Sequence, residues 1–141
     1  MGIRWGSWLL SGLVAGLVIT VSGTVFAHAV LGPSYVAAFR ARMATPYPPV
    51  GAIIAENLSL RFGYGLLGMF FYVAFRPRFG PGPRTALLAG AALALGTYLV
   101  PLYHLAQFGI LTGGKIGLAV GWDLAEAMIA CLLGAWVYRE P

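Results

Sequence analysis

Four long apolar stretches dominate this chain, and each is long enough to cross a membrane as one helix. A span needs about 20 apolar residues to cross the roughly 30 Å hydrocarbon layer. Only 9% of the residues are charged and 60% are hydrophobic, whereas soluble domains carry about 25% charged residues. The sequence therefore predicts an all-α integral membrane protein with one transmembrane domain over residues 1–141, with spans at about residues 5–31, 50–75, 85–108 and 116–138.

Short connections between these spans predict an up-down-up-down four-helix bundle with both ends of the chain on one side. Cytoplasmic loops carry an excess of Lys and Arg, so the more basic side indicates the cytoplasm. We therefore expect both termini in the cytoplasm. Because the positive-inside rule accounts for the basic residues, we expect no nucleic-acid partner. The basic residues on the side of the termini are Arg4, Arg76, Arg78, Arg84 and Arg139, against Arg40, Arg42 and Lys115 on the other side.

The first stretch begins like a secretory signal, since Arg4 precedes an apolar run that reaches small residues at positions 27–29. That run is longer than the roughly 7–15 residues of a signal core, so we expect a retained span. Gly12 and Gly16 form a small-xxx-small pattern, and with Gly23 they should let a second helix approach closely.

Pro and Gly mark the connections between the spans. Residues 32–49 open with Gly-Pro and close with three prolines. Between them we expect a short amphipathic interfacial helix, capped by Ser34 and lying along the membrane surface, with an irregular loop as the alternative. Residues 76–84 are expected to form a short basic loop, because their prolines and glycines disfavour a helix.

The third stretch contains a proline near its end. Pro101 removes the hydrogen bond that would have reached the carbonyl of Thr97, so we expect a kink. Gly90, Thr97, Pro101 and His104 recur at helical spacing, and this face is expected to be turned toward the bundle.

The fourth stretch contains two acids, Asp123 and Glu126, in an otherwise apolar run. Residues three apart share one face of a helix. A charge at bilayer depth costs about 3 kcal/mol or more. These carboxylates should therefore face protein or water rather than lipid.

Polar side chains of the other spans lie at a similar depth, in the outer half of the membrane, when residues are counted inward at about 1.5 Å each. Arg61 is the only deeply placed cation, and we expect it to pair with Asp123 or Glu126 across the bundle. The other polar groups would then bond one another or backbone carbonyls and fix the helix register. The predicted buried polar cluster contains Glu56, Asn57, Arg61, His104, Gln107, Asp123 and Glu126.

Ionisable groups inside a membrane are functional candidates by default, and several interpretations stay open. His28 and His104 end near one depth on spans that run in the same direction, so a haem or chlorin could be ligated between them. The histidines could instead join Glu56, Asp123 and Glu126 in a mixed metal site, although the Glu-x-x-His pairs of di-iron bundles are missing. Asp123 and Glu126 could also relay protons or bind a transported ion. Quinone or lipid chemistry completes the alternatives.

No pattern in the sequence indicates an enzyme. The Ser-Gly pairs at residues 11–12 and 22–23 have no base at helical spacing, and no phosphate-binding loop is present. Cys131 is the only cysteine, so it cannot form an intramolecular disulfide and is interpreted as a packing residue.

Two motifs carry a resemblance to a known class of protein. The segment FRPRFGPGPRTA at residues 75–86, followed by a helix of small residues, and GAWVYRE at residues 134–140, resemble small four-helix bacterial membrane proteins of unassigned function. The resemblance extends over nearly the whole chain. It implies this architecture and a multi-pass location in the bacterial inner (cytoplasmic) membrane, and it implies no activity.

We therefore expect a small accessory or scaffolding subunit packed against a larger membrane complex, such as an electron-transfer or photosynthetic assembly. Its partners would be lipid and other membrane subunits or further copies of itself, because glycine-rich helix faces favour close packing. One alternative is a haem-, metal- or quinone-binding protein that uses His28 and His104. The other is a proton or ion carrier that uses Asp123 and Glu126.

Overall fold

The computed structural model describes residues 4–42 and 49–138, and within these ranges every regular element is a helix. Four of its segments are long and apolar enough to cross a membrane: Trp5–Val30, Gly51–Phe79, Pro83–Gln107 and Gly114–Val137. The predicted all-α architecture with four candidate spans is confirmed. The elements are α1 (Trp5–Val25), the π-helical turn η1 (Phe26–Val30), α2 (Gly32–Arg42), α3 (Val50–Phe79), α4 (Pro83–Thr97), α5 (Leu99–Gln107) and α6 (Gly114–Val137).

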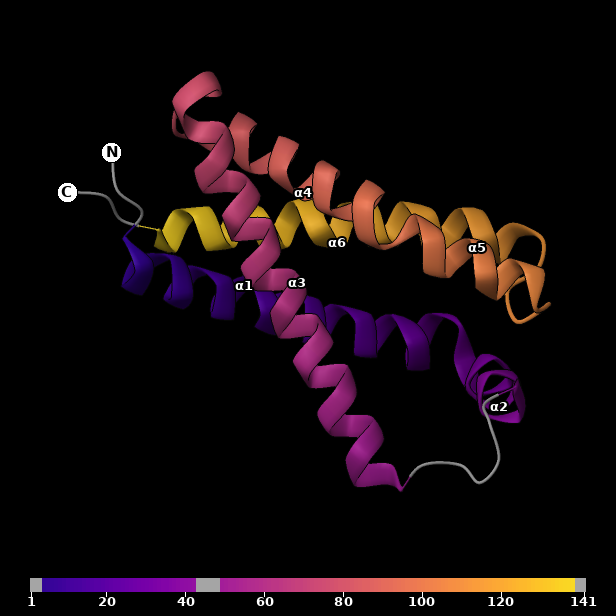
Figure 1. Cartoon of the computed structure of the whole chain (residues 1–141). Helices are drawn as coiled ribbons and strands as arrows, with labels where there is room; N and C mark the ends of the chain where they lie inside the picture. Colours follow the sequence, from indigo (N-terminus) through magenta and orange to yellow (C-terminus); the bar gives the residue numbers. More distant parts are fainter. Residues whose placement is uncertain (1–3, 43–48, 139–141) are drawn as a thin grey trace.

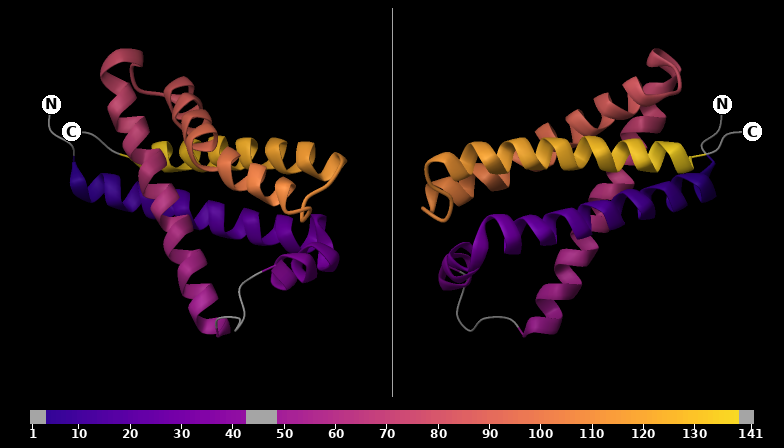
Figure 2. Two further views of the ribbon diagram at one scale, coloured as in Figure 1. Left: turned by 45° about the vertical axis from the view of Figure 1, so that its right-hand side comes forward. Right: turned by 180° about the vertical axis from the view of Figure 1, so that it is seen from behind.

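The four long helices α1, α3, α4 and α6 pack on one another, and α3 and α6 each contact the other three. Helix α1 lies against α3 and α6, and α4 lies against the same two helices. Helix α3 crosses α1 obliquely, so its first half projects away from the rest of the molecule (Figure 1). Two further views show the same projection, with α1 and α6 side by side and α3 crossing them (Figure 2). The first half of α3 is exposed on nearly every side over residues 51–60.

Glycines set the crossing of α1 and α3. A Cβ added at Gly65 would lie 2.6 Å from the Cα of Gly16 and closer still to the backbone nitrogen of Gly16 and the carbonyl oxygen of Gly12. A Cβ at Gly16 would in turn lie 2.8 Å from the Cα of Phe62. The close approach predicted for Gly12 and Gly16 is confirmed, and its partner helix is α3.

Small residues also bring α6 against α4 and α1. A Cβ added at Gly90 would lie 2.5 Å from the Cα of Met128, and one added at Gly134 would lie 3.0 Å from the carbonyl oxygen of Ser11. The main core between these helices is accordingly rich in small side chains, which include Ala15, Ala86, Ala89, Ala127, Ala130 and Cys131.

The loop expected at residues 76–84 is wrong in its first part, because α3 continues through Pro77 to Phe79. A proline this close to a helix end removes one hydrogen bond from the last turns rather than from the interior. The ring centroids of Phe75 and Phe79, one turn apart, lie 6.0 Å from each other, and this contact supports the extra turn. Gly80, with a φ of 79°, then ends the helix, as glycine commonly does in this left-handed conformation.

The predicted interruption of the third span is confirmed at Tyr98, which separates α4 from α5. Pro101 cannot donate a hydrogen bond to the carbonyl of Thr97, so the regular ladder breaks there. The buried residue of α5 is Leu102. His104 is exposed, which corrects the expectation that it shares a bundle-facing side with Gly90.

The first span ends in a wider turn than expected. The amide of Leu31 donates to the carbonyl of Phe26, five residues back, at 3.0 Å. A helix also follows this turn, as predicted, but it begins at Gly32, so Ser34 lies within its first turn rather than at its cap. Residues 43–48 of the predicted connector, and Arg139, lie outside the described residues.

Candidate functional site

Beyond their glycine crossing, α1 and α3 diverge, and the space between them holds a cavity. Its volume is about 230 Å³, and α1, η1, α2, α3, α5 and α6 all contribute to its wall. Apolar side chains form much of the lining. The charged and hydroxyl- or amide-bearing side chains that line it are Tyr35, Asn57, Arg61, Tyr64, Tyr98, Asp123 and Glu126.

Glu126 is the most deeply buried acid of this cavity, with only 6% of its surface exposed. Its Oε2 atom is buried and has no hydrogen-bond partner. Ser22 and Trp122 lie beside the same carboxyl group. The indole of Trp122 donates to the Ser22 hydroxyl at 3.1 Å and stacks on Phe26 with ring centroids 4.7 Å apart. These contacts fix the side of the cavity that α1, η1 and α6 form.

Asp123 lies one turn before Glu126 on α6, is half-buried and lines the same cavity. Facing the two acids is Arg61 of α3, whose Nη1 donates to the carbonyl of Ile19 at 2.7 Å. Gly23 of α1 leaves room for this guanidinium, which a Cβ at that position would strike. The backbone of α1 therefore holds Arg61 in place.

The expected direct pairing of Arg61 with an acid is not what the described residues show. No contact of 4.0 Å or less joins its guanidinium to Asp123 or Glu126. With all three groups ionised, the cavity therefore holds one negative charge in excess. An unpaired carboxylate oxygen in a low-dielectric site favours a cation or a proton.

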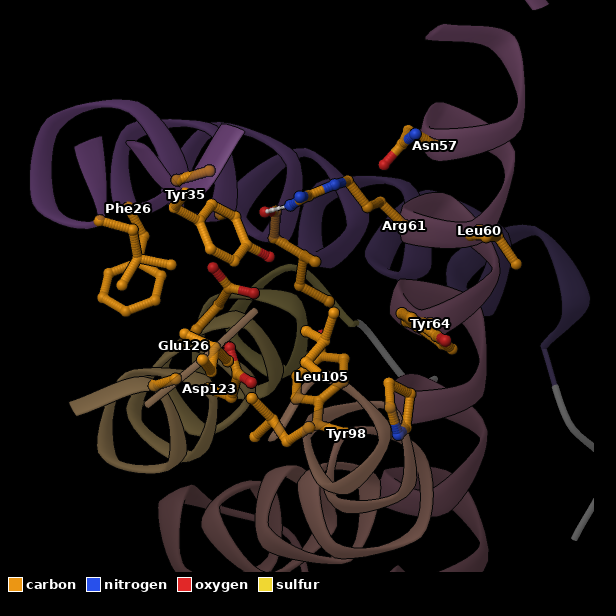
Figure 3. A pocket seen from close by; sticks show the side chains of 18 residues that line it. Phe26, Tyr35, Asn57, Leu60, Arg61, Tyr64, Tyr98, Leu105, Asp123 and Glu126 are labelled. Carbon is orange, nitrogen blue, oxygen red and sulfur yellow. Dashed lines mark hydrogen bonds between the residues drawn. The ribbon is translucent and has the colours of Figure 1, made fainter. Parts of the chain in front are cut away.

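Tyrosines complete the polar wall. The hydroxyl of Tyr98 is buried and has no hydrogen-bond partner, and its ring meets that of Tyr64 edge-on at 5.4 Å. Tyr35 enters from α2 on the side of the carboxylates (Figure 3). Burial, and secondly the nearby Asp123, raise the pKa of Tyr35 above its ordinary value of 10. Its hydroxyl thus stays protonated at neutral pH and can donate a hydrogen bond.

The structure brings together four residues of the predicted cluster, Asn57, Arg61, Asp123 and Glu126, around one cavity. The other three predicted members do not line it. Glu56 is exposed on the projecting half of α3, and His104 and Gln107 are exposed on α5.

The two histidines lie in different surroundings. His28, in η1, has its Nδ1 atom 3.0 Å from the carbonyl of Thr24. The ring of His104 lies beside those of Tyr103 and Phe108. Neither histidine lines the central cavity. Over residues 4–42 and 49–138, no three His, Cys, Asp or Glu side chains form a group that could hold a metal ion.

A second cavity, which we call the wedge, opens between α1 with η1 and the projecting half of α3. Its volume is about 330 Å³. Ala27, Asn57 and Arg61 line both the wedge and the central cavity. The wedge is also lined by Thr20, Thr24, His28, Ile53, Ile54 and Leu58.

Sequence reasoning did not nominate the tyrosines of this site. Helical spacing offered one signal, because Asn57, Arg61 and Tyr64 stand at i, i+4 and i+7 on one face of α3. Tyr35 and Tyr98 had no comparable signal. Their positions depend on the turn after η1 and on the break between α4 and α5.

Comparison of the chain with known protein families, with curated proteins and with solved structures finds no match in any of the three. The case for a function accordingly depends on the cavity and on the exposed faces of the helices.

Proposed function

We propose that this protein is a multi-pass membrane protein whose central cavity binds a ligand with a positively charged group, which Asp123 and Glu126 hold. One observation carries the proposal. The Oε2 atom of Glu126 accepts no hydrogen bond from the described residues, although only 6% of the side chain is exposed. Leaving a buried charged acceptor unpaired is costly, so such an atom is typical of a site that a ligand completes.

Arg61, the cation that lines the cavity, does not pair with Asp123 or Glu126. Arg61 donates to the backbone of α1, and the aromatic rings of Tyr64 and Tyr98 stand in the wall of the same cavity. A cation is attracted both by carboxylates and by the faces of aromatic rings. A small ammonium group can interact with both the carboxylates and the aromatic rings. Without such a ligand, a proton on one of the two acids would neutralise the excess negative charge.

The test is carbodiimide labelling of the purified full chain in detergent, with the labelled residue and the rate read by mass spectrometry. A hydrophobic carbodiimide adds to protonated carboxyl groups in apolar sites. We expect labelling at Glu126 or Asp123 that slows as methylammonium chloride is added at constant ionic strength. In the Glu126→Gln variant, methylammonium should no longer slow the carbodiimide labelling.

Glu56→Gln is the matched control, because this acid is exposed on α3 outside the cavity. It should leave both the labelling and the protection unchanged. If neither acid of α6 is labelled, or if methylammonium, sodium and potassium all fail to slow the reaction, the cavity is not a cation site.

The orientation that we propose is an up-down-up-down crossing of a bacterial inner membrane with both termini in the cytoplasm. The contacts of α1 with α3 support opposite directions, since Gly12 meets Leu66 whereas Gly16, further along α1, meets Phe62. The start of α1 also meets the end of α6, where Ser11 lies beside Gly134. The basic residues at the end of α3 and the start of α4 support a cytoplasmic position. Helix α2 then lies along the outer surface, and cysteine accessibility at Arg40 and Arg78 in intact cells tests both placements.

A second candidate function, an accessory or scaffolding subunit, is favoured by the projecting half of α3. Glu56 is exposed there, within a candidate span, whereas the neighbouring Asn57 and Ser59 donate to the carbonyls of Ile53 and Ala55 in their own helix. Polar side chains at membrane depth are expensive unless another protein group satisfies them. A subunit with a basic or hydrogen-bonding side chain at that depth would do so.

Purification from native membranes in a gentle detergent tests this second function. We expect a partner subunit in equimolar amount that is lost on Glu56→Leu and kept on Leu95→Ala, whose parent residue is exposed on α4. A monomer that purifies alone would refute it. A visible absorption band in the same fraction that disappears on His28→Ala or His104→Ala would favour the haem alternative instead.

A further inference from the structure

The central cavity and the wedge share part of their lining, so the two spaces adjoin. Ala27, Asn57 and Arg61 line both spaces. The wedge lies between α1 with η1 and the exposed half of α3, which no other described helix covers (Figure 1). In a membrane this opening faces the lipid. Arg61 therefore stands between the lipid-facing wedge and the central cavity, on the shortest route by which a ligand could pass from the bilayer to the acids.

The walls of the wedge suit an acyl chain. Ile54 and Leu58 are exposed on the α3 side. On the α1 side, the hydroxyls of Thr20 and Thr24 donate to the carbonyls of Gly16 and Thr20, at 2.8 and 2.7 Å. Because these donors are satisfied within their own helix, the threonines present mainly methyl groups.

Arg61 stands where the wedge meets the cavity. Within residues 4–42 and 49–138, its one hydrogen bond is the one that Nη1 donates to the carbonyl of Ile19. A guanidinium has five N–H donors in a planar fork that matches the oxygens of a phosphate. An anionic group is therefore favoured at the threshold between the two spaces.

The inner end of the path has the opposite charge. Asp123 and Glu126 lie on the α6 side of the cavity (Figure 3), and the buried Oε2 atom of Glu126 has no hydrogen-bond partner. A primary ammonium carries three N–H donors and can fill that acceptor, whereas a quaternary ammonium has none. The path thus runs from apolar walls to a cation and then to a pair of acids.

Resting on the cation site proposed above, we infer that the ligand is an aminophospholipid, with its acyl chains in the wedge, its phosphate at Arg61 and its primary ammonium at Asp123 and Glu126. The volume agrees with a headgroup. At about 230 Å³, the cavity has room for a small polar group but not for two acyl chains as well. The glycerol and the chains must stay outside, in the wedge.

Native mass spectrometry of the purified full chain tests this assignment with three lipids of identical dioleoyl chains, offered at equal concentration. These are phosphatidylethanolamine, phosphatidylcholine and phosphatidylglycerol. We expect retention of phosphatidylethanolamine to exceed that of the other two several-fold. Retention of phosphatidylglycerol equal to or above it would overturn the inference, because a purely anionic headgroup lacks the ammonium.

Two variants separate the two ends of the headgroup. Glu126→Gln should reduce phosphatidylethanolamine to the level of phosphatidylcholine and leave phosphatidylglycerol unchanged. Arg61→Gln should weaken all three lipids, since each has a phosphate. Glu56→Gln is the control and should change none of them. A preference for phosphatidylethanolamine that survives Glu126→Gln would refute the site.

Folding of each variant is checked by the protection of the buried Cys131 from a maleimide, and Arg61→Lys replaces Arg61→Gln if the latter unfolds. Arg61→Lys should retain more lipid than Arg61→Ala, because it keeps the positive charge. Equal retention by these two variants would remove Arg61 from the site.

Soluble glycerophosphoethanolamine distinguishes a lipid from a free headgroup. Competition by it at lipid-like concentrations would overturn entry from the bilayer. If methylammonium protects Glu126 from the carbodiimide while the three lipids bind equally, the cation site stands and the aminophospholipid assignment falls. If methylammonium also fails, both proposals fall.

Discussion

Gly65→Ala tests whether the α1–α3 crossing depends on the absence of one methyl group. The added Cβ would lie 2.6 Å from the Cα of Gly16 and would meet the backbone of Gly12, and neither neighbour is a side chain that can rotate away. Ordinary contact begins near 3.4 Å, so the two helices would have to separate by about 1 Å. The helices that hold the cavity would separate with them.

The energetic consequence has two opposing terms. Overpacking of a tight contact costs about 1–3 kcal/mol, and alanine returns up to about 1 kcal/mol of helix propensity relative to glycine. A net loss of about 1–2 kcal/mol remains. Since 1 kcal/mol shifts the midpoint by about 2–4 °C in a chain near this size, we expect Gly65→Ala to melt about 2–8 °C lower.

The chain supplies its own reporter for this measurement. Cys131 is the only cysteine and is fully buried in the main core, so a fluorogenic maleimide reacts with it when the bundle opens. Gly63→Ala is the matched control, because a Cβ on Gly63 meets nothing within 4 Å. It should melt at or above the midpoint of the wild type. A Gly65→Ala variant that melts as high as Gly63→Ala would refute the close-packed crossing.

Three further predictions use the same thermal assay or a titration. Pro77→Ala should raise the midpoint, because it restores one helix hydrogen bond near the end of α3. Arg76→Ala should lower it by a few degrees, since its guanidinium lies 5.6 Å from the ring centroid of Tyr72 and 5.3 Å from that of Tyr138, and each such contact contributes about 0.5–1 kcal/mol. Because the pKa of Tyr35 is raised above 10 in the fold, its neutral form stabilises the protein fully below pH 10, and this contribution is lost as pH rises further. Tyr35→Phe should accordingly lose less stability than the wild type between pH 10 and 11.

Hydropathy and the spacing of small residues were enough to predict the helices and one of their contacts. Apolar length alone located four candidate spans, because the bilayer sets a minimum length that few other structures require. Gly12 and Gly16 indicated a close helix contact for the same kind of reason, since only small side chains permit it. Neither signal says which helix will be the partner.

The site was less accessible from the sequence, because it depends on angles between helices. Equal depth placed Arg61, Asp123 and Glu126 in one layer, and the structure puts them around one cavity. Depth does not tell in which direction around its helix a side chain points, however. It could not show that Glu56 stands on the projecting half of α3, or that Arg61 donates to the backbone of α1.

Helix α3 has a mechanical consequence that follows from its length. Its 30 residues extend about 45 Å at 1.5 Å each, which exceeds the roughly 30 Å of hydrocarbon. A helix longer than the bilayer accommodates the mismatch by tilting. We expect α3 to take up this tilt about its crossing with α1, where Gly12, Gly16 and Gly65 meet. A thicker membrane should then draw α3 more upright and narrow the wedge beside α1, so that the thickness of the surrounding bilayer would set the width of the wedge.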